Sequence, residues 1–221
     1  MKRNNLIFTA MSALIAMTLL AACGSTHKAA QSNDGWISLF DGKTLNGWKA
    51  SESQQTFRVE DGSILAQGPR SHLYYDGSVM NHDFRNFEFQ AEVMTKPGAN
   101  SGIYFHTRFQ PAGYPDTGFE VQVNNSSEDW KKTGCLYDIK DFGNQYAKDN
   151  EWFTMYIKVQ GKHVIVKVNG RQVIDWTQPE GFVAPEGHPG RYISSGTFAF
   201  QEHDAKSIVY FRNIKVRPLP D

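Results

Sequence analysis

The sequence predicts an all-β fold in which two antiparallel sheets pack face to face, as a sandwich or jelly roll. Three observations indicate it. Apolar and polar residues alternate with a period of two along many short stretches rich in aromatic and β-branched residues. Turn-forming pairs such as Asp61-Gly62 and Asn169-Gly170 separate these stretches. No stretch longer than about two turns has the 3.6-residue period of an amphipathic helix.

Seven strands follow from the alternation. In chain order they are FEFQAEV (87–93), SGIYFH (101–106), FEVQVN (119–124), FTMYIKV (153–159), VIVKV (164–168), FAFQEH (198–203) and IVYFRNIKV (208–216). The tight connection at 160–162 joins two of them as a hairpin, and residues 168–173 predict a second hairpin around Asn169-Gly170. Pro-Gly pairs at 97–98 and 189–190 mark further turns.

Composition excludes several classes of protein. The 221 residues are 40% hydrophobic and 21% charged, with no formal net charge. That length fits one large or two small domains. The absence of a basic excess argues against a nucleic-acid binder. A mean hydropathy of −0.50 excludes a multi-span membrane protein, and two cysteines exclude a disulfide scaffold.

The N-terminus has the pattern of a lipoprotein signal. Lys2 and Arg3 precede an apolar run that ends in Leu-Ala-Ala before Cys23. This order is typical of a secretory signal peptide, and the cysteine resembles the acylated cysteine of bacterial lipoproteins. We expect a signal peptide at 1–22, a lipidated flexible tether at 23–35 and the folded domain at 36–221. The lipid would anchor the domain to the cell envelope, with the outer membrane as the expected membrane. An ordinary signal peptide and an uncleaved anchor are the alternatives.

Alternation also assigns side chains to sheet faces. In 119–124 the apolar residues face the core and the polar residues share the opposite face. The expected non-core faces hold Glu120, Gln122 and Asn124 on one strand, Tyr104, His106 and Arg108 on a second, and Gln201 and His203 on a third. These planar hydrogen-bonding and stacking groups suit a sugar site. The alternative is the ordinary polar face of a solvated antiparallel sheet.

An ordered set of motifs resembles a known family. These are WISLFDGKTLNGW (36–48), FRVEDGSI (57–64), ANSGI (99–103), GFEVQV (118–123), EW (151–152), VNG (168–170), QEH (201–203) and FRNI (211–214). Over about residues 36–217 the chain resembles the 3-keto-disaccharide hydrolase domain family. The resemblance implies a fold of the concanavalin A-like lectin and glucanase type, which agrees with the predicted sandwich.

The resemblance also implies a substrate, a disaccharide or glycoside oxidised at its third carbon. The hydrogen on the second carbon of such a sugar is acidic. A base can remove it, the ketone oxygen takes the charge as an enolate, the first-carbon oxygen leaves, and water adds to the enone. This route needs a base, an acid and donors for the oxyanion. We expect Glu120 and His203 to be the acid and base, in either order. Alternatively, Glu120 pairs with Arg108 across strands, and His203 caps a turn through Asp204.

The other polar residues of these faces are expected to bind the substrate. The expected donors to the oxyanion and to sugar hydroxyls are Arg108, Gln122 and Gln201. Tyr104, His106 and Asn124 are expected to hold sugar hydroxyls or rings. Tyr137 and Lys140 are expected to border the cleft.

Two other functions remain open at this stage. One is a non-catalytic, lectin-like carbohydrate-binding module, which would need the same polar face. The other is a conventional glycosidase, which needs two carboxylates. No second carboxylate shares the strand of Glu120, so Glu88, Glu92, Asp116 or Asp138 would have to supply it.

No cofactor is evident from the sequence. The seven histidines are scattered without a close pair, so we expect no metal site. Calcium, which lectin-like folds often hold, has no readable ligand loop. The expected partners are a small carbohydrate and, through the lipid, a membrane; the basic clusters are too short for nucleic acid.

Overall fold

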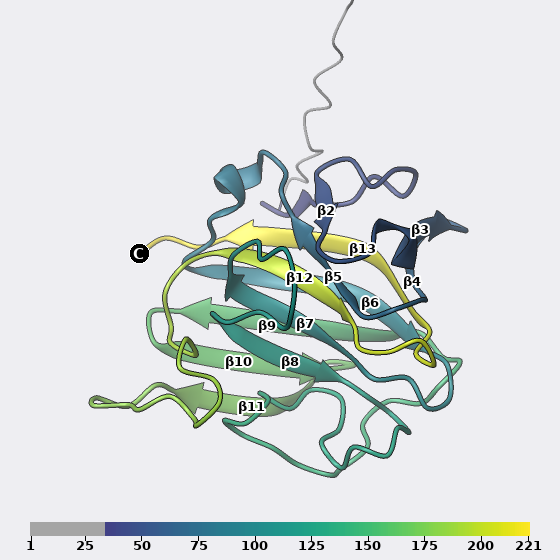
Figure 1. Cartoon of the computed structure of the whole chain (residues 1–221). Coiled ribbons are helices and arrows are strands. Elements are labelled where there is room, and N and C mark those ends of the chain that lie inside the picture. The colour runs from purple at the N-terminus through teal and green to yellow at the C-terminus, as the bar shows by residue number, and fades with distance from the viewer. Residues whose placement is uncertain (1–33) are drawn as a thin grey trace, which may run out of the picture.

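Residues 34–221, which the computed structural model describes, form two antiparallel β-sheets packed face to face (Figure 1). The larger sheet has eight strands in the order β11-β10-β9-β6-β13-β4-β3, with β1 paired to β13. The smaller sheet has five, in the order β2-β5-β12-β7-β8. The predicted all-β, two-sheet fold is confirmed.

The strand bounds are as follows. They are β1 Ile37–Ser38, β2 Trp48–Ala50, β3 Phe57–Glu60, β4 Ser63–Ala66, β5 Ser71–Tyr75, β6 Phe87–Thr95, β7 Ser101–Thr107, β8 Phe119–Val123, β9 Phe153–Gln160, β10 His163–Val168, β11 Arg171–Thr177, β12 Thr197–Glu202 and β13 Val209–Pro218. Within residues 34–221 the helical segments are two 3-10 turns, η1 Gln54–Thr56 and η2 Val79–His82.

All seven expected strands are present, as β6 to β10, β12 and β13. The predicted hairpin at 168–173 joins β10 to β11. The sequence analysis did not assign β1 to β5. These strands are only two to five residues long and lie between closely spaced turns, so a period of two has little length over which to show.

Phenylalanines fill the space between the two sheets. Phe200 of β12 stacks on Phe211 of β13, with ring centroids 4.2 Å apart and planes 3° from parallel. The ring of Phe198 in β12 contacts those of Phe87 and Phe89 in β6, with centroids 4.9 and 4.6 Å apart. The three apolar residues of β8 are also fully buried, as alternation predicted. Burial of these aromatic side chains holds the sheets together.

The outer face of the five-stranded sheet positions the site. Across it Tyr104 pairs with Glu120, and Gln201 pairs with His72. The segment 133–137 extends the sheet beyond β8. The backbone N–H of Tyr137 donates to the Glu120 carbonyl at 2.9 Å, and that of Gln122 donates to the Cys135 carbonyl at 3.0 Å. This added edge forms one wall above the sheet.

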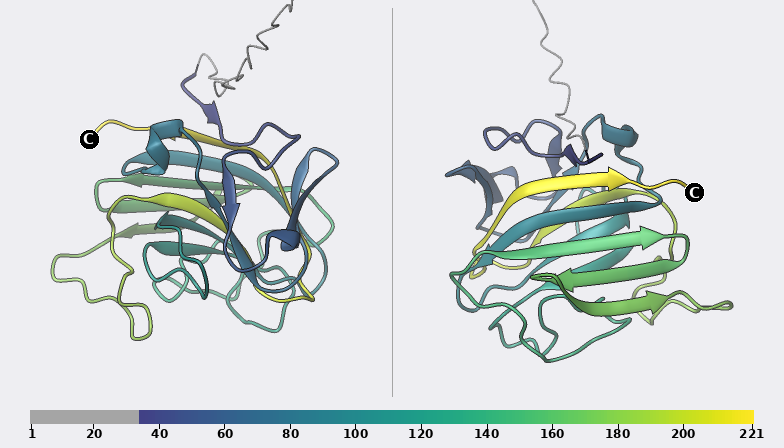
Figure 2. Two further views of the ribbon diagram at one scale, coloured as in Figure 1. Left: turned by 45° about the horizontal axis from the view of Figure 1, so that its top comes forward. Right: turned by 180° about the vertical axis from the view of Figure 1, so that it is seen from behind.

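Two loops supply the remaining walls. Residues 108–118 connect β7 to β8, and residues 178–196 connect β11 to β12 as a long loop that projects from the sandwich (Figure 2). The second loop returns the chain from the larger sheet to the smaller one.

Two of the predictions concern the N-terminal segment. The expected signal peptide at 1–22 and most of the tether, including Cys23, lie outside the described residues. Both, and the boundary at 36, remain predictions. In residues 34–221 no helix has the length and apolar character needed to cross a bilayer.

Candidate active site

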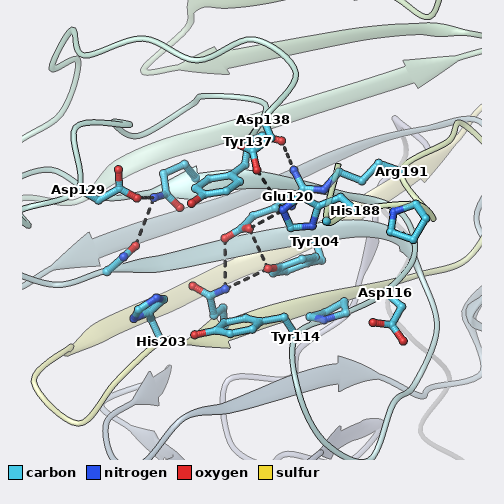
Figure 3. Close-up of a pocket in the computed structure, with 16 residues that line it drawn as sticks. Tyr104, Tyr114, Asp116, Glu120, Asp129, Tyr137, Asp138, His188, Arg191 and His203 are labelled. Atoms are coloured by element: carbon cyan, nitrogen blue, oxygen red, sulfur yellow. Dashed lines mark hydrogen bonds and ion pairs between the residues drawn. The ribbon is translucent and has the colours of Figure 1, made fainter. Parts of the chain in front are cut away.

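A pocket of about 380 Å³ opens on the outer face of the five-stranded sheet. This volume is within the range of small-molecule sites. Six of the sequence-predicted site residues line it: Tyr104, Glu120, Gln122, Tyr137, Gln201 and His203. Strand alternation therefore brought residues from β7, β8 and the end of β12 to one cavity (Figure 3).

Glu120 is the centre of a buried hydrogen-bonded cluster. The Tyr104 hydroxyl donates to Glu120 Oε2 at 2.8 Å. Gln201 Nε2 donates to the Tyr104 oxygen at 3.0 Å and to Glu120 Oε1 at 3.2 Å. Burial raises the pKa of Glu120 to about 7, against the opposing effects of the Arg191 charge and the Tyr104 hydrogen bond. A carboxyl group with this pKa can take or give a proton near neutral pH.

Gly102 explains how the Glu120 side chain fits. A Cβ added at Gly102 would lie 2.3 Å from Glu120 Oε1 and 2.8 Å from its Cγ. The carboxyl group therefore lies across the backbone of β7 at a position where no side chain fits. The glycine of the ANSGI motif gives the catalytic candidate its room, which is a use of glycine within a strand.

Arg191 forms an ion pair with Glu120 and was not among the residues predicted from the sequence. Its Nη2 lies 3.8 Å from Glu120 Oε2, both side chains being nearly buried, and its Nη1 donates to the Tyr137 carbonyl. Glu120 therefore pairs with Arg191 and not with Arg108. The Pro189-Gly190 turn positions Arg191, the next residue. Gly190 packs so closely against the Asp116 carbonyl that a Cβ there would lie only 2.1 Å from its oxygen. The turn was visible in the sequence, but its contact was not.

Asp138 forms a second charged cluster in the pocket wall. Lys131 donates to it, and His188 Nε2 lies 3.0 Å from its Oδ2. Burial is the largest single influence and opposes ionisation of Asp138, but the Lys131 hydrogen bond and the nearby positive charges together outweigh it and lower the pKa of Asp138. Asp138 is therefore a paired carboxylate. Of the other carboxylates considered, Asp116 lines the pocket.

The remaining two considered carboxylates lie elsewhere. Glu88 and Glu92 belong to β6 of the larger sheet, where they pair with Arg217 and Arg212. Neither lines the pocket.

His203 follows the last residue of β12 and lines the pocket. Its Nδ1 lies 3.0 Å from Asp204 Oδ2, so the contact with Asp204 that was named as the alternative to an acid–base role is present. Nε2 has no hydrogen-bond partner in the described part of the chain and is the ring nitrogen available to a ligand.

The structure does not bring four of the predicted site residues into the pocket. His106 was expected on the face of Tyr104, but its φ is 55° and the β7–β12 pairing is irregular beside it. Its ring contacts Phe87 at 5.7 Å, and its Nε2 lies 2.9 Å from the Arg85 carbonyl. The bulge reverses the side chain, because one irregular residue interrupts the period of two.

The other three residues have separate surroundings. Arg108 lines a second cavity of about 230 Å³. Asn124 is buried, and its amide donates to the carbonyls of Asp129 and Lys131 at 2.9 and 2.8 Å, which organises the following loop. Lys140 is exposed.

Family comparison agrees with this geometry. Residues 35–217 match the model of the 3-keto-alpha-glucoside-1,2-lyase-like domain. The chain belongs to this family. The match covers both sheets up to the penultimate residue of β13 and all the loops that line the pocket, and it confirms the resemblance on which the expected function depended.

Individual relatives support a hydrolase of this family. A 3-keto-disaccharide hydrolase from Bacteroides thetaiotaomicron is 27% identical over 231 residues, which cover 84% of this chain and 79% of the relative. A crystal structure from Parabacteroides distasonis, described as a "putative glycosyl hydrolase", is 26% identical with a TM-score of 0.72, covering 85% of this chain and 95% of that one. The predicted assignment to a glycosyl hydrolase is therefore supported.

A more distant structure bears on the fold alone. A Bacillus subtilis protein with a galectin-like fold is 12% identical with a TM-score of 0.55, covering 79% of this chain and 90% of that one. The family domain is thus a lectin-like sandwich. Its pocket combines a carboxyl group of near-neutral pKa, a histidine and a buried arginine. In residues 34–221 no group of three or more His, Cys, Asp or Glu side chains is arranged to hold a metal ion.

Proposed function

We propose that this protein cleaves 3-keto-disaccharides or 3-keto-glycosides by elimination followed by hydration. The observation that carries the proposal is the Glu120 carboxyl group, buried in a polar pocket with a pKa raised to about 7. One such group suffices to remove an acidic C–H proton. The family and the curated relative, both described by their 3-keto-sugar chemistry, support this class of substrate.

The proposed steps balance without a redox change. Glu120 takes the C2 proton, and the C–H electron pair forms an enolate whose charge lies on the ketone oxygen. The ketone then re-forms as a C1–C2 double bond is made and the bond from C1 to the glycosidic oxygen breaks. The leaving oxygen accepts a proton. After the leaving sugar departs, the proton on Glu120 exchanges with solvent. Water then adds across the double bond: its hydroxyl goes to C1 and its proton to His203, while Glu120 gives a proton to C2, so both residues return to their starting protonation states.

His203 is the proposed acid. With Nδ1 facing the Asp204 carboxylate, Nε2 carries the proton that passes to the leaving oxygen. This assigns Glu120 and His203 to separate steps of one reaction, so the two do not compete for the same proton. An imidazole N–H at hydrogen-bond distance from the leaving oxygen can act as a general acid.

Arg191 is the proposed donor to the enolate oxygen. Its Nη1 is already engaged by the Tyr137 carbonyl, and its Nη2 is 3.8 Å from Glu120, beyond hydrogen-bond distance. Nη2 can therefore donate to an oxyanion that forms beside Glu120. A preorganised cation in a buried site stabilises developing charge more strongly than it would in water.

The test compares a 3-keto-disaccharide with its unoxidised parent, using the purified protein and following sugar release. We expect release from the oxidised sugar alone. Turnover of the parent alone would favour a conventional two-carboxylate glycosidase. Binding of either sugar without turnover would favour a lectin-like module.

We also propose that lipid on Cys23 anchors the protein in the cell envelope. The proposal is supported by the signal pattern that precedes this cysteine. The wild-type protein should incorporate labelled fatty acid in bacterial cells, and Cys23→Ala should abolish the incorporation. Undiminished labelling of this variant would contradict a lipid anchor at this residue.

A further inference from the structure

Tyr114 reaches the pocket from the loop between β7 and β8, and Figure 3 draws its ring on the opposite side from Tyr137, with Glu120 between them. The side chain of Gln110 stabilises this loop through hydrogen bonds to its backbone. Its Nε2 donates to the carbonyls of Ala112 and Tyr114 at 2.8 and 2.7 Å, and its Oε1 accepts from the Asp116 N–H at 3.0 Å. The backbone of Tyr114 is therefore held in place.

The Tyr114 ring is also held. It meets the ring of His72 at 5.7 Å and 77°, an edge contact. The Arg70 guanidinium carbon lies 5.1 Å from its centroid, and Glu52 fixes that guanidinium with hydrogen bonds of 2.8 and 3.3 Å. Tyr114 nevertheless remains 40% exposed. A ring that is exposed and yet fixed loses little conformational freedom when a ligand packs on it.

Tyr114 differs from the other two tyrosines of the pocket. Tyr104 is only 3% exposed, and its hydroxyl is committed to Glu120. Lys131 Nζ lies 3.6 Å from the centroid of the Tyr137 ring. Tyr114 therefore offers an accessible ring in a pocket whose other lining side chains are mostly polar. The C–H face of a sugar ring is apolar, and an aromatic ring with a polar tip is a suitable surface for it.

His72 links Tyr114 to the catalytic cluster. It is fully buried on β5, and its ring meets Tyr104 at 5.6 Å and Tyr114 at 5.7 Å. Burial lowers its pKa to about 4, so the ring is uncharged at neutral pH. Neither ring nitrogen has a hydrogen-bond partner in residues 34–221. His72 therefore serves as an aromatic support that fixes Tyr114 relative to Tyr104 and, through it, Glu120.

The position of His203 next to Tyr114 indicates which of the two sugar rings packs on Tyr114. His203, the proposed acid, lies 5.9 Å from Tyr114 between ring centroids. The glycosidic oxygen that takes the proton joins the two sugar rings. We infer that the reacting ring lies beside Glu120 and Tyr104, and that the leaving ring of the disaccharide packs on Tyr114. This inference deepens the proposed function and rests on it.

The test uses two substrates, a 3-keto-disaccharide and the methyl 3-keto-glucoside, which lacks the second ring. Tyr114→Leu removes the platform, and Tyr114→Phe keeps it. The matched control is Phe109→Leu, because Phe109 is on the same loop and is 38% exposed, but packs on Tyr74 outside the pocket. We expect Tyr114→Leu to lower the ratio of kcat/KM for the disaccharide over the methyl glycoside about tenfold, mainly through KM. The ratio should stay within about twofold of wild type in Tyr114→Phe and Phe109→Leu.

Three results would overturn the inference. One is an equal loss on both substrates in Tyr114→Leu, which would mean that Tyr114 serves the reacting ring or the fold. Another is an unchanged ratio in that variant, and the third is an equal fall in Phe109→Leu. If the wild-type protein turns over neither keto-sugar, the proposed function itself fails and the inference fails with it.

Discussion

The hydroxyl of Tyr104 donates a hydrogen bond of 2.8 Å to Oε2 of Glu120, and both side chains are buried on the outer face of one sheet. Burial disfavours the Glu120 carboxylate, and this hydrogen bond favours it. The pKa of Tyr104 is raised well above its ordinary value, first by burial and then by the Glu120 charge. The hydroxyl therefore keeps its proton at neutral pH and remains a donor.

Tyr104→Phe should shift the pH dependence of the reaction. Without the hydrogen bond the pKa of Glu120 rises above about 7, so the carboxylate proposed as the base forms only at higher pH. Hydrogen bonds to charged groups contribute about 1.5–3 kcal/mol, which corresponds to about one to two pH units. The acidic limb of kcat/KM should move upward by that amount. An unmoved limb, or one moved downward, would show that this pair does not set the pKa of the base.

Glu120→Gln should abolish most of the activity with little effect on the fold. Glutamine has nearly the same shape but cannot take a proton from carbon. Release of sugar from a 3-keto-disaccharide should fall at least about a hundredfold, as expected for loss of an acid–base group. The melting temperature should hardly change, because the site already disfavours a charge. Full activity in this variant would place the base elsewhere.

Two substitutions of Arg191 can separate the effect of its charge on the pKa of Glu120 from its proposed role as a hydrogen-bond donor to the enolate. Arg191→Met removes the cation that opposes the effect of burial on Glu120, so the acidic limb of kcat/KM should move to higher pH. Arg191→Lys keeps the charge but loses the planar guanidinium, so its limb should stay near the wild-type position. We expect kcat to fall in both, because both alter the donor to the enolate. Wild-type kcat in both variants would contradict that role.

Gly102→Ala should displace the Glu120 carboxyl group, the proposed base. Its Cβ would fall 2.3 Å from Glu120 Oε1, and the φ of Gly102 is not in the left-handed region. The variant should fold and lose activity at least about tenfold. Gly143→Ala is the control, because its Cβ would meet no atom closer than 3.5 Å. Equal activity in the two variants would show that Gly102 does not make room for Glu120.

The raised pKa of Glu202 predicts that the stability of the fold depends on pH, independently of catalysis. This β12 residue is fully buried, and its carboxyl oxygens have no hydrogen-bond partner in the described residues. Burial, and then the Asp204 charge, raise its pKa from 4.5 to about 9. The stability that follows is complete below about pH 4.5 and is lost as the pH rises through 9, because the folded state holds a proton that the unfolded state has released.

Glu202→Gln should remove this dependence. Between pH 5 and 9, the free energy of unfolding of the wild type should fall relative to the variant by about 1.4 kcal/mol per pH unit at most. Denaturant titrations of both proteins at several pH values measure the difference. Parallel pH profiles would show that Glu202 does not hold its proton in the folded state. Glu120 remains in both proteins and cancels in the comparison.

The sequence predicted the parts of the site that lie on regular strands. Alternation alone assigns Glu120 and Gln122 to the outer face of β8 and Tyr104 to that of β7, because the direction of each side chain follows from its parity. Antiparallel pairing then brings them together. His106 departs from this rule at a bulge, which one sequence does not reveal.

Loop residues could not be placed in the same way. Arg191 and Tyr114 lie in connections without any periodicity, and their positions depend on contacts far away in the chain. Arg191 depends on the packing of Gly190 against the Asp116 carbonyl. Tyr114 depends on His72 of β5, a strand too short for its alternation to be recognised.

The most direct test of the proposed chemistry is the fate of the C2 hydrogen. The purified protein is given a 3-keto-disaccharide in D₂O, and the released 3-keto-glucose is examined by NMR, with preformed 3-keto-glucose as the control for slow exchange. Elimination and hydration predict one deuterium at C2 of each released sugar, early in the reaction and above the control. Early release of sugar that keeps hydrogen at C2 would contradict transfer of the C2 proton to a base that exchanges with water before hydration.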